Sequence, residues 1–176
     1  MLRTHTAAGS NPLALAQIVA SHCAGEGALP PWLGLDEVTV NALFDRFFPG
    51  LEAPAKLAQG TAPDTARAAE RADLRRLLMN YGVDQSPETG WIASLLVDGS
   101  MGPDHLWRDL GLWNRGELSA LIQRNFPELF ARNEYDMKWK KFFYKQLCDE
   151  EGIYTCRAPS CEYCPSYLDC YGSEED

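Results

Sequence analysis

The sequence predicts a mostly α-helical protein, built as a single helical domain that ends in an irregular, cysteine-rich metal-binding loop. Apolar residues recur at spacings of three and four along most of the chain, and residues that start or stop helices bracket these stretches. No segment shows the alternation of apolar and polar residues that is typical of a strand. At 176 residues, 45% of them hydrophobic, the chain is long enough for one domain with its own core. We expect one domain over residues 1–176, with a helical body at 1–152, a cysteine loop at 153–170 and an acidic tail at 171–176.

The first half of the chain predicts three helices separated by loops. Glycine or proline follows each apolar stretch, and both residue types favour helix termination. Residues 53–62 carry few large apolar groups and are expected to form a linker. The expected helices are Pro12 to Ala24, Asp36 to Phe48, and a helix that opens at Thr61–Asp64 and extends to Tyr81.

Capping residues define the elements of the second half. Ser86 followed by Pro87 is typical of a helix start, because serine caps the first turn and proline fits its first position. Asn114 with Glu117 three residues later has the spacing of a capping box. The expected helices run from Ser86 to about Asp98, through a short segment after Met101–Asp104, from Asn114 to Phe126, and from an Asn133 cap through Glu134 to Cys148.

The large apolar side chains of the last expected helix recur every four residues, which indicates a buried face. Trp107 and Trp113 are likewise expected in the core, as is Cys23 on the first helix. The side chains predicted to form that buried face are Tyr135, Trp139, Phe143 and Leu147.

Composition excludes some classes of function. A net charge of −9 argues against binding to nucleic acid, which requires a basic face. The chain has no run of 18 apolar residues, so no membrane span is expected. The short apolar stretch at 13–20 lacks a signal-peptide cleavage site, because His22 stands where small residues are needed. We therefore expect a cytoplasmic protein.

Four cysteines lie close together near the carboxyl terminus with the spacing C-x4-C-x2-C-x5-C: Cys156, Cys161, Cys164 and Cys170. Crowded thiolates repel one another, and a cation or a cationic cluster removes that repulsion. The pattern therefore predicts a metal site. The first three cysteines have the spacing of plant-type iron–sulfur ferredoxins, whereas zinc sites more often use two CxxC pairs. Spacing alone favours an iron–sulfur cluster and leaves zinc and disulfides open.

Two segments that precede the cysteines, together with the cysteine spacing, resemble the NifQ family, the molybdenum donors of nitrogen fixation. One is the lysine- and aromatic-rich stretch at 136–148, and the other covers 104–112, followed by Arg115, Glu117-Leu118 and Phe126-Pro127. The resemblance implies that the four clustered cysteines hold an iron–sulfur cluster of the 3Fe–4S type that takes up molybdenum. It also implies delivery of molybdenum to iron–molybdenum cofactor assembly, with the cofactor scaffold complex and the nitrogenase iron protein as partners.

Further residues extend this candidate site. His105 lies in a segment that carries the resemblance, and imidazole is a suitable ligand for molybdenum or iron; the alternative is a histidine that hydrogen-bonds within its own helix start. Cys148 is either a spare ligand or a plain thiol at a helix end. Lys138, Lys141 and Lys145 share one helix side, with Lys140 adjacent, and either attract molybdate or form a solvated face.

No nucleophile–base pair or phosphate loop is present, so a metal carrier is expected rather than an enzyme. The alternatives are a small electron-transfer iron–sulfur protein, in which all four cysteines bind a closed cluster, and an interaction module stabilised by zinc. The acidic end of the chain, residues 174–176, is expected to be a solubilising tail.

Overall fold

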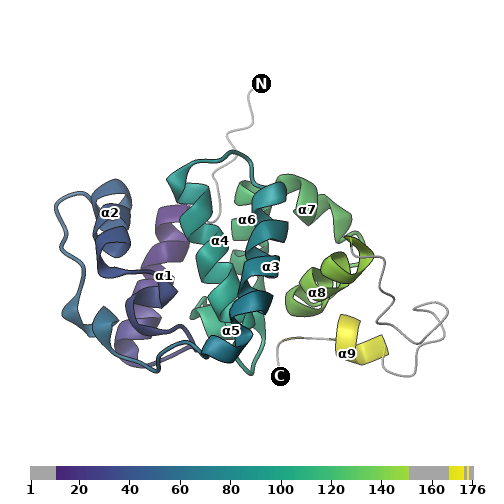
Figure 1. Cartoon of the computed structure of the whole chain (residues 1–176), viewed down its shortest axis with the longest axis horizontal. Coiled ribbons are helices and arrows are strands. Elements are labelled where there is room, and N and C mark those ends of the chain that lie inside the picture. Colours follow the sequence, from purple (N-terminus) through teal and green to yellow (C-terminus); the bar gives the residue numbers. More distant parts are fainter. Residues whose placement is uncertain (1–10, 151–166, 173, 175–176) are drawn as a thin grey trace.

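The structure is a computed structural model that describes residues 11–150, 167–172 and 174. Helices joined by turns and irregular segments make up the described residues, and no strand occurs among them, which confirms the mostly α prediction (Figure 1). Within the described ranges, short 3-10 helices lie at Pro31–Gly34, Ala55–Ala58 and Thr65–Arg67. The α-helices are α1 (Asn11–Ala24), α2 (Glu37–Phe47), α3 (Ala68–Asn80), α4 (Pro87–Ser100), α5 (Leu106–Leu110), α6 (Arg115–Asn125), α7 (Pro127–Arg132), α8 (Trp139–Glu150) and α9 (Tyr167–Tyr171).

Helix α4 runs through the centre of the molecule, between α3 and α5 (Figure 1). Ser86 caps it through a hydrogen bond from the Thr89 amide at 3.3 Å, as its sequence predicted. Most of its residues are buried, because helices cover it on more than one side; among them are Ile92, Ala93, Leu95 and Leu96, each with 0% of its surface exposed. The segment at 92–97, apolar except for Ser94, therefore forms the middle of the core.

Helix α8 packs against α3 and carries the aromatic part of the core. Trp139, Phe143 and Leu147 are buried, as predicted. The Trp139 ring stacks on Phe130 at 5.9 Å between centroids and donates its Nε1–H to Ser119 Oγ at 3.1 Å. The amino-terminal end of α8 is thereby fixed against α6 and α7.

The expected start of this helix at Glu134 was wrong. The side chain of Asn133 does not cap a helix but forms a closed pair with Met137, accepting from its amide at 2.8 Å and donating to its carbonyl at 2.9 Å. Asp136 lies inside this loop with a left-handed φ of 53°. Because the helix starts only at Trp139, Tyr135 lies outside it and is 79% exposed, which corrects its predicted place in the core.

Other expectations also need correction. Phe126-Pro127 ends α6 as predicted, but Pro127 is also the first residue of α7, a helix that the sequence analysis missed. Trp113 is 67% exposed rather than buried. The expected irregular loop at 153–170 is wrong at its end, because α9 is helical; residues 153–166 lie outside the described residues. None of the helices in the described part of the chain has the length and apolar character needed to span a membrane.

Candidate metal centre and its surroundings

Of the four clustered cysteines, the structure describes Cys170. It lies on α9 and is partly buried against the core. The other three, Cys156, Cys161 and Cys164, fall outside the described residues. The candidate centre is therefore approached through the elements that hold Cys170 and through the surface next to α9.

Lys138 attaches α9 to the start of α8. Its backbone amide donates to the Cys170 carbonyl at 2.7 Å, and its Nζ donates to the Leu168 carbonyl at 3.1 Å. The last carbonyls of a helix lack partners within that helix. Lys138 thus supplies a donor to the Cys170 carbonyl and a second one to the Leu168 carbonyl, which also accepts from the Gly172 amide at 2.8 Å. The backbone of Cys170 is thereby fixed beside the first turn of α8.

Helix α8 also separates the two described ends of the cysteine segment. With 12 residues it is about 18 Å long at a rise of 1.5 Å per residue. The chain leaves the described helical body at Glu150, at the far end of α8, and α9 contacts its beginning (Figure 1). Cys148 therefore lies near the opposite end of α8 from Cys170, and the structure does not bring these two cysteines together.

A hydrogen-bond network between α3 and α8 holds α8 in place. The hydroxyl of Tyr144 donates to the Glu70 carboxylate, which also accepts two hydrogen bonds from Arg67, at 2.7 and 2.8 Å. The hydrogen bonds from Arg67 are the main cause that lowers the pKa of Glu70 to about 2. Burial, together with the hydrogen bond to Glu70, raises the pKa of Tyr144 to about 12. Glu70 is therefore ionised and Tyr144 neutral at neutral pH.

His105 borders the same surface as α9. It is the residue before α5, and its ring lines a cavity of about 390 Å³. Asp169 of α9 lines the cavity too, so His105 and the helix that carries Cys170 share one hollow. The remaining residues around it include Asp104, Lys138, Lys140, Lys141 and Glu174.

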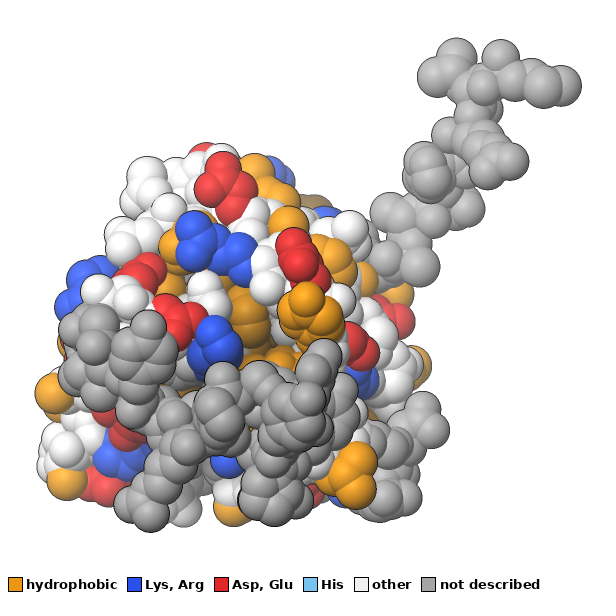
Figure 2. Space-filling view, turned by 90° about the vertical axis from the view of Figure 1, so that its right-hand side faces the viewer, with side chains coloured by type: hydrophobic (Ala, Val, Ile, Leu, Met, Phe, Trp, Pro, Cys, Tyr) orange, Lys and Arg blue, Asp and Glu red, His pale blue; other side chains and the backbone are white. Residues whose placement is uncertain are grey.

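The structure separates the four lysines of this region. Lys138 and Lys141 line the cavity, whereas Lys145 pairs with Asp149 at 2.7 Å and is not among its lining residues. Lys140 donates to the Asp109 carboxylate and to the Gly102 carbonyl, the latter at 2.8 Å, so its charge is already neutralised. Figure 2 shows the face that carries α8: where side chains are coloured by type, basic and acidic groups are interspersed around an apolar centre. They do not form one basic patch there.

Glu174 is the residue that the sequence analysis missed most clearly, because it was expected in a solvated tail. Its side chain is only 4% exposed. One carboxylate oxygen lies 3.8 Å from His105 Nδ1 and the other 3.3 Å from Arg115 Nε. Arg115 was noticed in sequence only as part of the family resemblance, and no local pattern indicates that these distant residues meet.

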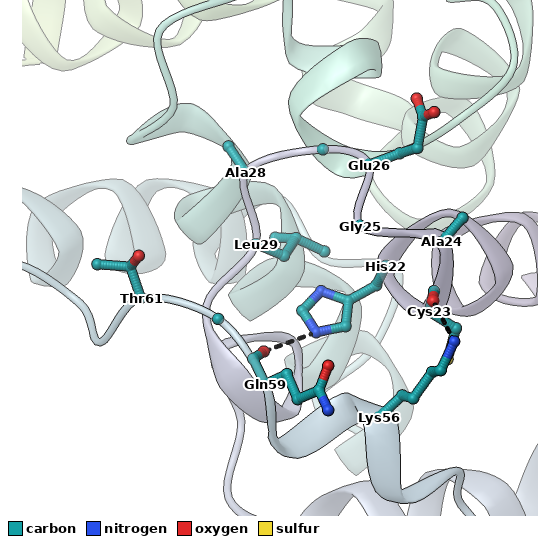
Figure 3. Close-up of a pocket in the computed structure, with 12 residues that line it drawn as sticks. His22, Cys23, Ala24, Gly25, Glu26, Ala28, Leu29, Lys56, Gln59 and Thr61 are labelled. Atoms are coloured by element: carbon teal, nitrogen blue, oxygen red, sulfur yellow. Dashed lines mark hydrogen bonds between the residues drawn. The ribbon is translucent and has the colours of Figure 1, made fainter.

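His22 and Cys23, which are neighbours in the chain, lie away from the surface that carries His105 and α9. Figure 3 shows His22 with its ring turned to the Gln59 carbonyl, 3.1 Å from Nε2, and Lys56 donating to the Cys23 carbonyl at 3.3 Å. Cys23 packs against the core, as predicted, but it is only partly buried and also lines a hollow at the surface. His22, Cys23, Lys56 and Gln59 line a hollow of about 550 Å³. It lies at the end of α1, on the side of the molecule away from α9 (Figure 1).

Within residues 11–150, 167–172 and 174, no three histidine, cysteine or acidic side chains are grouped closely enough to hold a metal ion. Neither His105 nor Cys148 thus forms a site with other described ligands. Their predicted roles as ligands stay predictions.

Comparison with known proteins gives a family match over nearly the whole chain. The NifQ family model matches residues 14–172. Protein NifQ of Azotobacter vinelandii is 43% identical over 175 residues, which cover 94% of this chain and 90% of that protein. Protein NifQ of Rhodobacter capsulatus is 40% identical, covering 91% and 87%. A NifQ homolog of Sinorhizobium fredii is 36% identical, covering 86% and 66%. No solved structure matches the chain.

Proposed function

The chain belongs to the NifQ family, which takes part in nitrogen fixation, and from this membership we propose that it carries molybdenum to the assembly of the nitrogenase iron–molybdenum cofactor. In this proposal the cargo is molybdenum, taken up as molybdate. The recipients are the cofactor scaffold complex and the nitrogenase iron protein. The protein acts as a carrier and not as an enzyme.

The donor set of the chain fits an iron–sulfur cluster that accepts molybdenum. Cys156, Cys161, Cys164 and Cys170 supply four soft thiolates within a short segment. Three of them suffice to hold the irons of a 3Fe–4S cluster, and the fourth, or a nearby nitrogen such as that of His105, is left for molybdenum. When bound, such a cluster supplies sulfides that are soft donors for the metal. The protein's own part is to hold its thiolates deprotonated and close together.

The observation that carries this proposal is the C-x4-C-x2-C-x5-C pattern, whose first three cysteines have the spacing of iron–sulfur ferredoxins, in a chain that the NifQ model matches as far as residue 172. The described end of that pattern supports it: Lys138 fixes the backbone of Cys170 to a helix of the folded body. This bond places the backbone of one candidate ligand next to the folded body.

The test is elemental analysis of the full-length protein, purified without air, for iron, sulfide, molybdenum and zinc. We expect iron and sulfide in the wild type, molybdenum after incubation with molybdate and reductant, and loss of both metals in Cys161→Ala. Cys23→Ala is the matched control, because this cysteine packs against the core at the other side of the molecule. This variant is expected to keep the metal content of the wild type. Wild-type protein without iron, before and after reconstitution, rejects the proposal.

The ferredoxin-like spacing of the first three cysteines favours a second candidate, a small electron-transfer protein. Redox titration without air distinguishes the two. Reversible one-electron cycling without molybdenum uptake supports electron transfer, whereas molybdenum uptake supports the carrier. A colourless protein with about one zinc per chain indicates instead an interaction module stabilised by zinc.

A further inference from the structure

The ion pairs of Glu174 are unusual for a buried carboxylate. Hydrogen bonds between charged groups normally measure about 2.7–2.9 Å, whereas the Glu174 oxygens lie 3.3 Å from Arg115 Nε and 3.8 Å from His105 Nδ1. Within the described part of the chain, neither Oε2 of Glu174 nor Nε of Arg115 makes a hydrogen bond, although both atoms are buried. Buried charges without hydrogen bonds are unfavourable, so this carboxylate fits its surroundings poorly.

The groups that face Glu174 are held in place by the rest of the fold. Both Nη atoms of Arg115 are engaged, with the Asp136 carboxylate at 2.6 Å and with the carbonyls of Asp136 and Met137 at 3.1 and 3.2 Å. These bonds direct the remaining donor, Nε–H, toward Glu174. His105 is fixed at the start of α5, where its own amide donates to Asp104 at 2.6 Å. Arg115 Nε and His105 Nδ1 therefore form an anion cradle, in which the other bonds of Arg115 hold its guanidinium in place.

We propose that the cradle between His105 and Arg115 binds a tetrahedral oxyanion, and that the Glu174 carboxylate holds the place of that anion in this structure. A planar carboxylate presents its oxygens in one plane and reaches neither donor well. A tetrahedral oxyanion presents acceptors in more directions and carries more negative charge. The choice of molybdate among such anions rests on the proposed function.

The cavity beside Glu174 gives the anion a place and a route. Its volume of about 390 Å³ is ample for one small anion, and Lys138 and Lys141 line it. Two carboxylates, Asp104 and Asp169, line it as well. With Glu174 in the cradle, three carboxylates face these two lysines; displacement of Glu174 by the anion leaves two carboxylates against two lysines, so the repulsion of an anion is reduced. Because Asp169 precedes Cys170, an anion bound there lies beside the helix that carries a candidate cluster ligand.

The test is calorimetric titration of full-length, metal-free protein with molybdate, tungstate, sulfate and phosphate. We expect molybdate and tungstate to bind, and Glu174→Gln to bind molybdate about tenfold more tightly, because the competing carboxylate charge is gone. Glu128→Gln, on the exposed surface of α7, removes the same charge elsewhere and serves as the matched control with wild-type affinity. Arg115→Gln, checked for folding by circular dichroism, is expected to lose binding.

Three outcomes overturn the inference: equal molybdate affinity in the wild type and Glu174→Gln, an equal gain in Glu128→Gln, or no binding of any of the four anions. Binding of sulfate and phosphate without molybdate supports the oxyanion cradle and rejects only molybdate as its anion. Because the titration uses protein without iron, its result is independent of the metal analysis that tests the carrier function. If the protein binds molybdate in the cradle but never holds iron, the oxyanion site is supported and the carrier function is rejected. If the protein holds iron but its molybdate affinity does not depend on Glu174, the carrier function is supported and the oxyanion site is rejected.

Discussion

Residues of the same type make different contacts in this protein, and the lysines of the α8 region are the clearest case. Four lysines lie within eight positions of the chain, yet one holds α9, one is bound to Asp109, one pairs with Asp149, and Lys141 is exposed at the cavity. The sequence grouped three of them by helical spacing. Spacing locates a side chain on a helix but does not identify its partner, which for Lys138 and Lys140 comes from a distant segment.

Lys141→Gln should slow molybdenum loading by about two- to tenfold, because a positive charge at the mouth of a cavity raises the rate at which an anion arrives. Lys145→Gln is the matched control and should load at the wild-type rate, since its charge is paired with Asp149 and lies outside the cavity. The measurement is molybdenum uptake against time at fixed molybdate. The difference between the variants should narrow as salt is raised; equal rates at low salt contradict the prediction.

Glu70 gives a prediction on acid stability. Its pKa is lowered to about 2 in the folded chain, mainly by the hydrogen bonds from Arg67, against an ordinary value of 4.5. A folded pKa below the unfolded one stabilises the protein above pH 4.5, and this contribution disappears as the pH falls toward 2. Glu70→Gln should therefore be less stable than wild type at pH 7, with a gap that closes between pH 4.5 and 2. Urea unfolding over this range measures it, and a gap that does not change with pH contradicts it.

At the scale of elements, the caps that proved correct are those whose side chain reaches its own first turn. Ser86 and Asn114 accept hydrogen bonds from amides three residues ahead, as their sequences predicted. Asn133 has the same residue type and an acidic residue after it, but it bonds to Met137 and closes a loop. Pro127 was read only as a stop, although proline also suits a first helical position, which is the place it takes in α7. Local sequence leaves both choices open, and tertiary packing decides between them.

Helix α4 provides the test of the core. Leu96→Ala, at a site with 0% exposure, should lower the free energy of unfolding by about 2–5 kcal/mol, because the removed methyl groups leave a cavity among well-packed neighbours. Val38→Ala on α2, where the side chain is 79% exposed, should change it by no more than about 0.5 kcal/mol. Urea denaturation of both variants gives the comparison. A Leu96→Ala effect as small as that of Val38→Ala would mean that α4 is not the centre of the core.

At the scale of the whole molecule, the helical body and the candidate metal centre meet along α8. The body packs on one side of this helix, and α9 attaches to its start. The cysteine spacing was readable from the sequence because the four cysteines are close neighbours in the chain. Glu174, Arg115 and His105 were not readable as a group, because they come from three separate segments: the start of α5, the start of α6 and the chain after α9.

This arrangement predicts that metal loading stabilises the entire fold and not only the cysteine segment. A ligand that binds the folded chain alone adds about 2.7 kcal/mol at a concentration of 100 times its Kd. For a chain of this size that corresponds to a rise in Tm of at least about 5 °C. Because Cys170 is bonded through its backbone to Lys138, the gain in stability should reach α8 and the core behind it.

Thermal unfolding followed by helical circular dichroism, with and without reconstituted iron and sulfide, should show the rise in Tm in the wild type and in Cys23→Ala. Cys170→Ala should lose it. A Tm that does not respond to reconstitution in protein shown to contain iron would mean that the centre is energetically separate from the helical body.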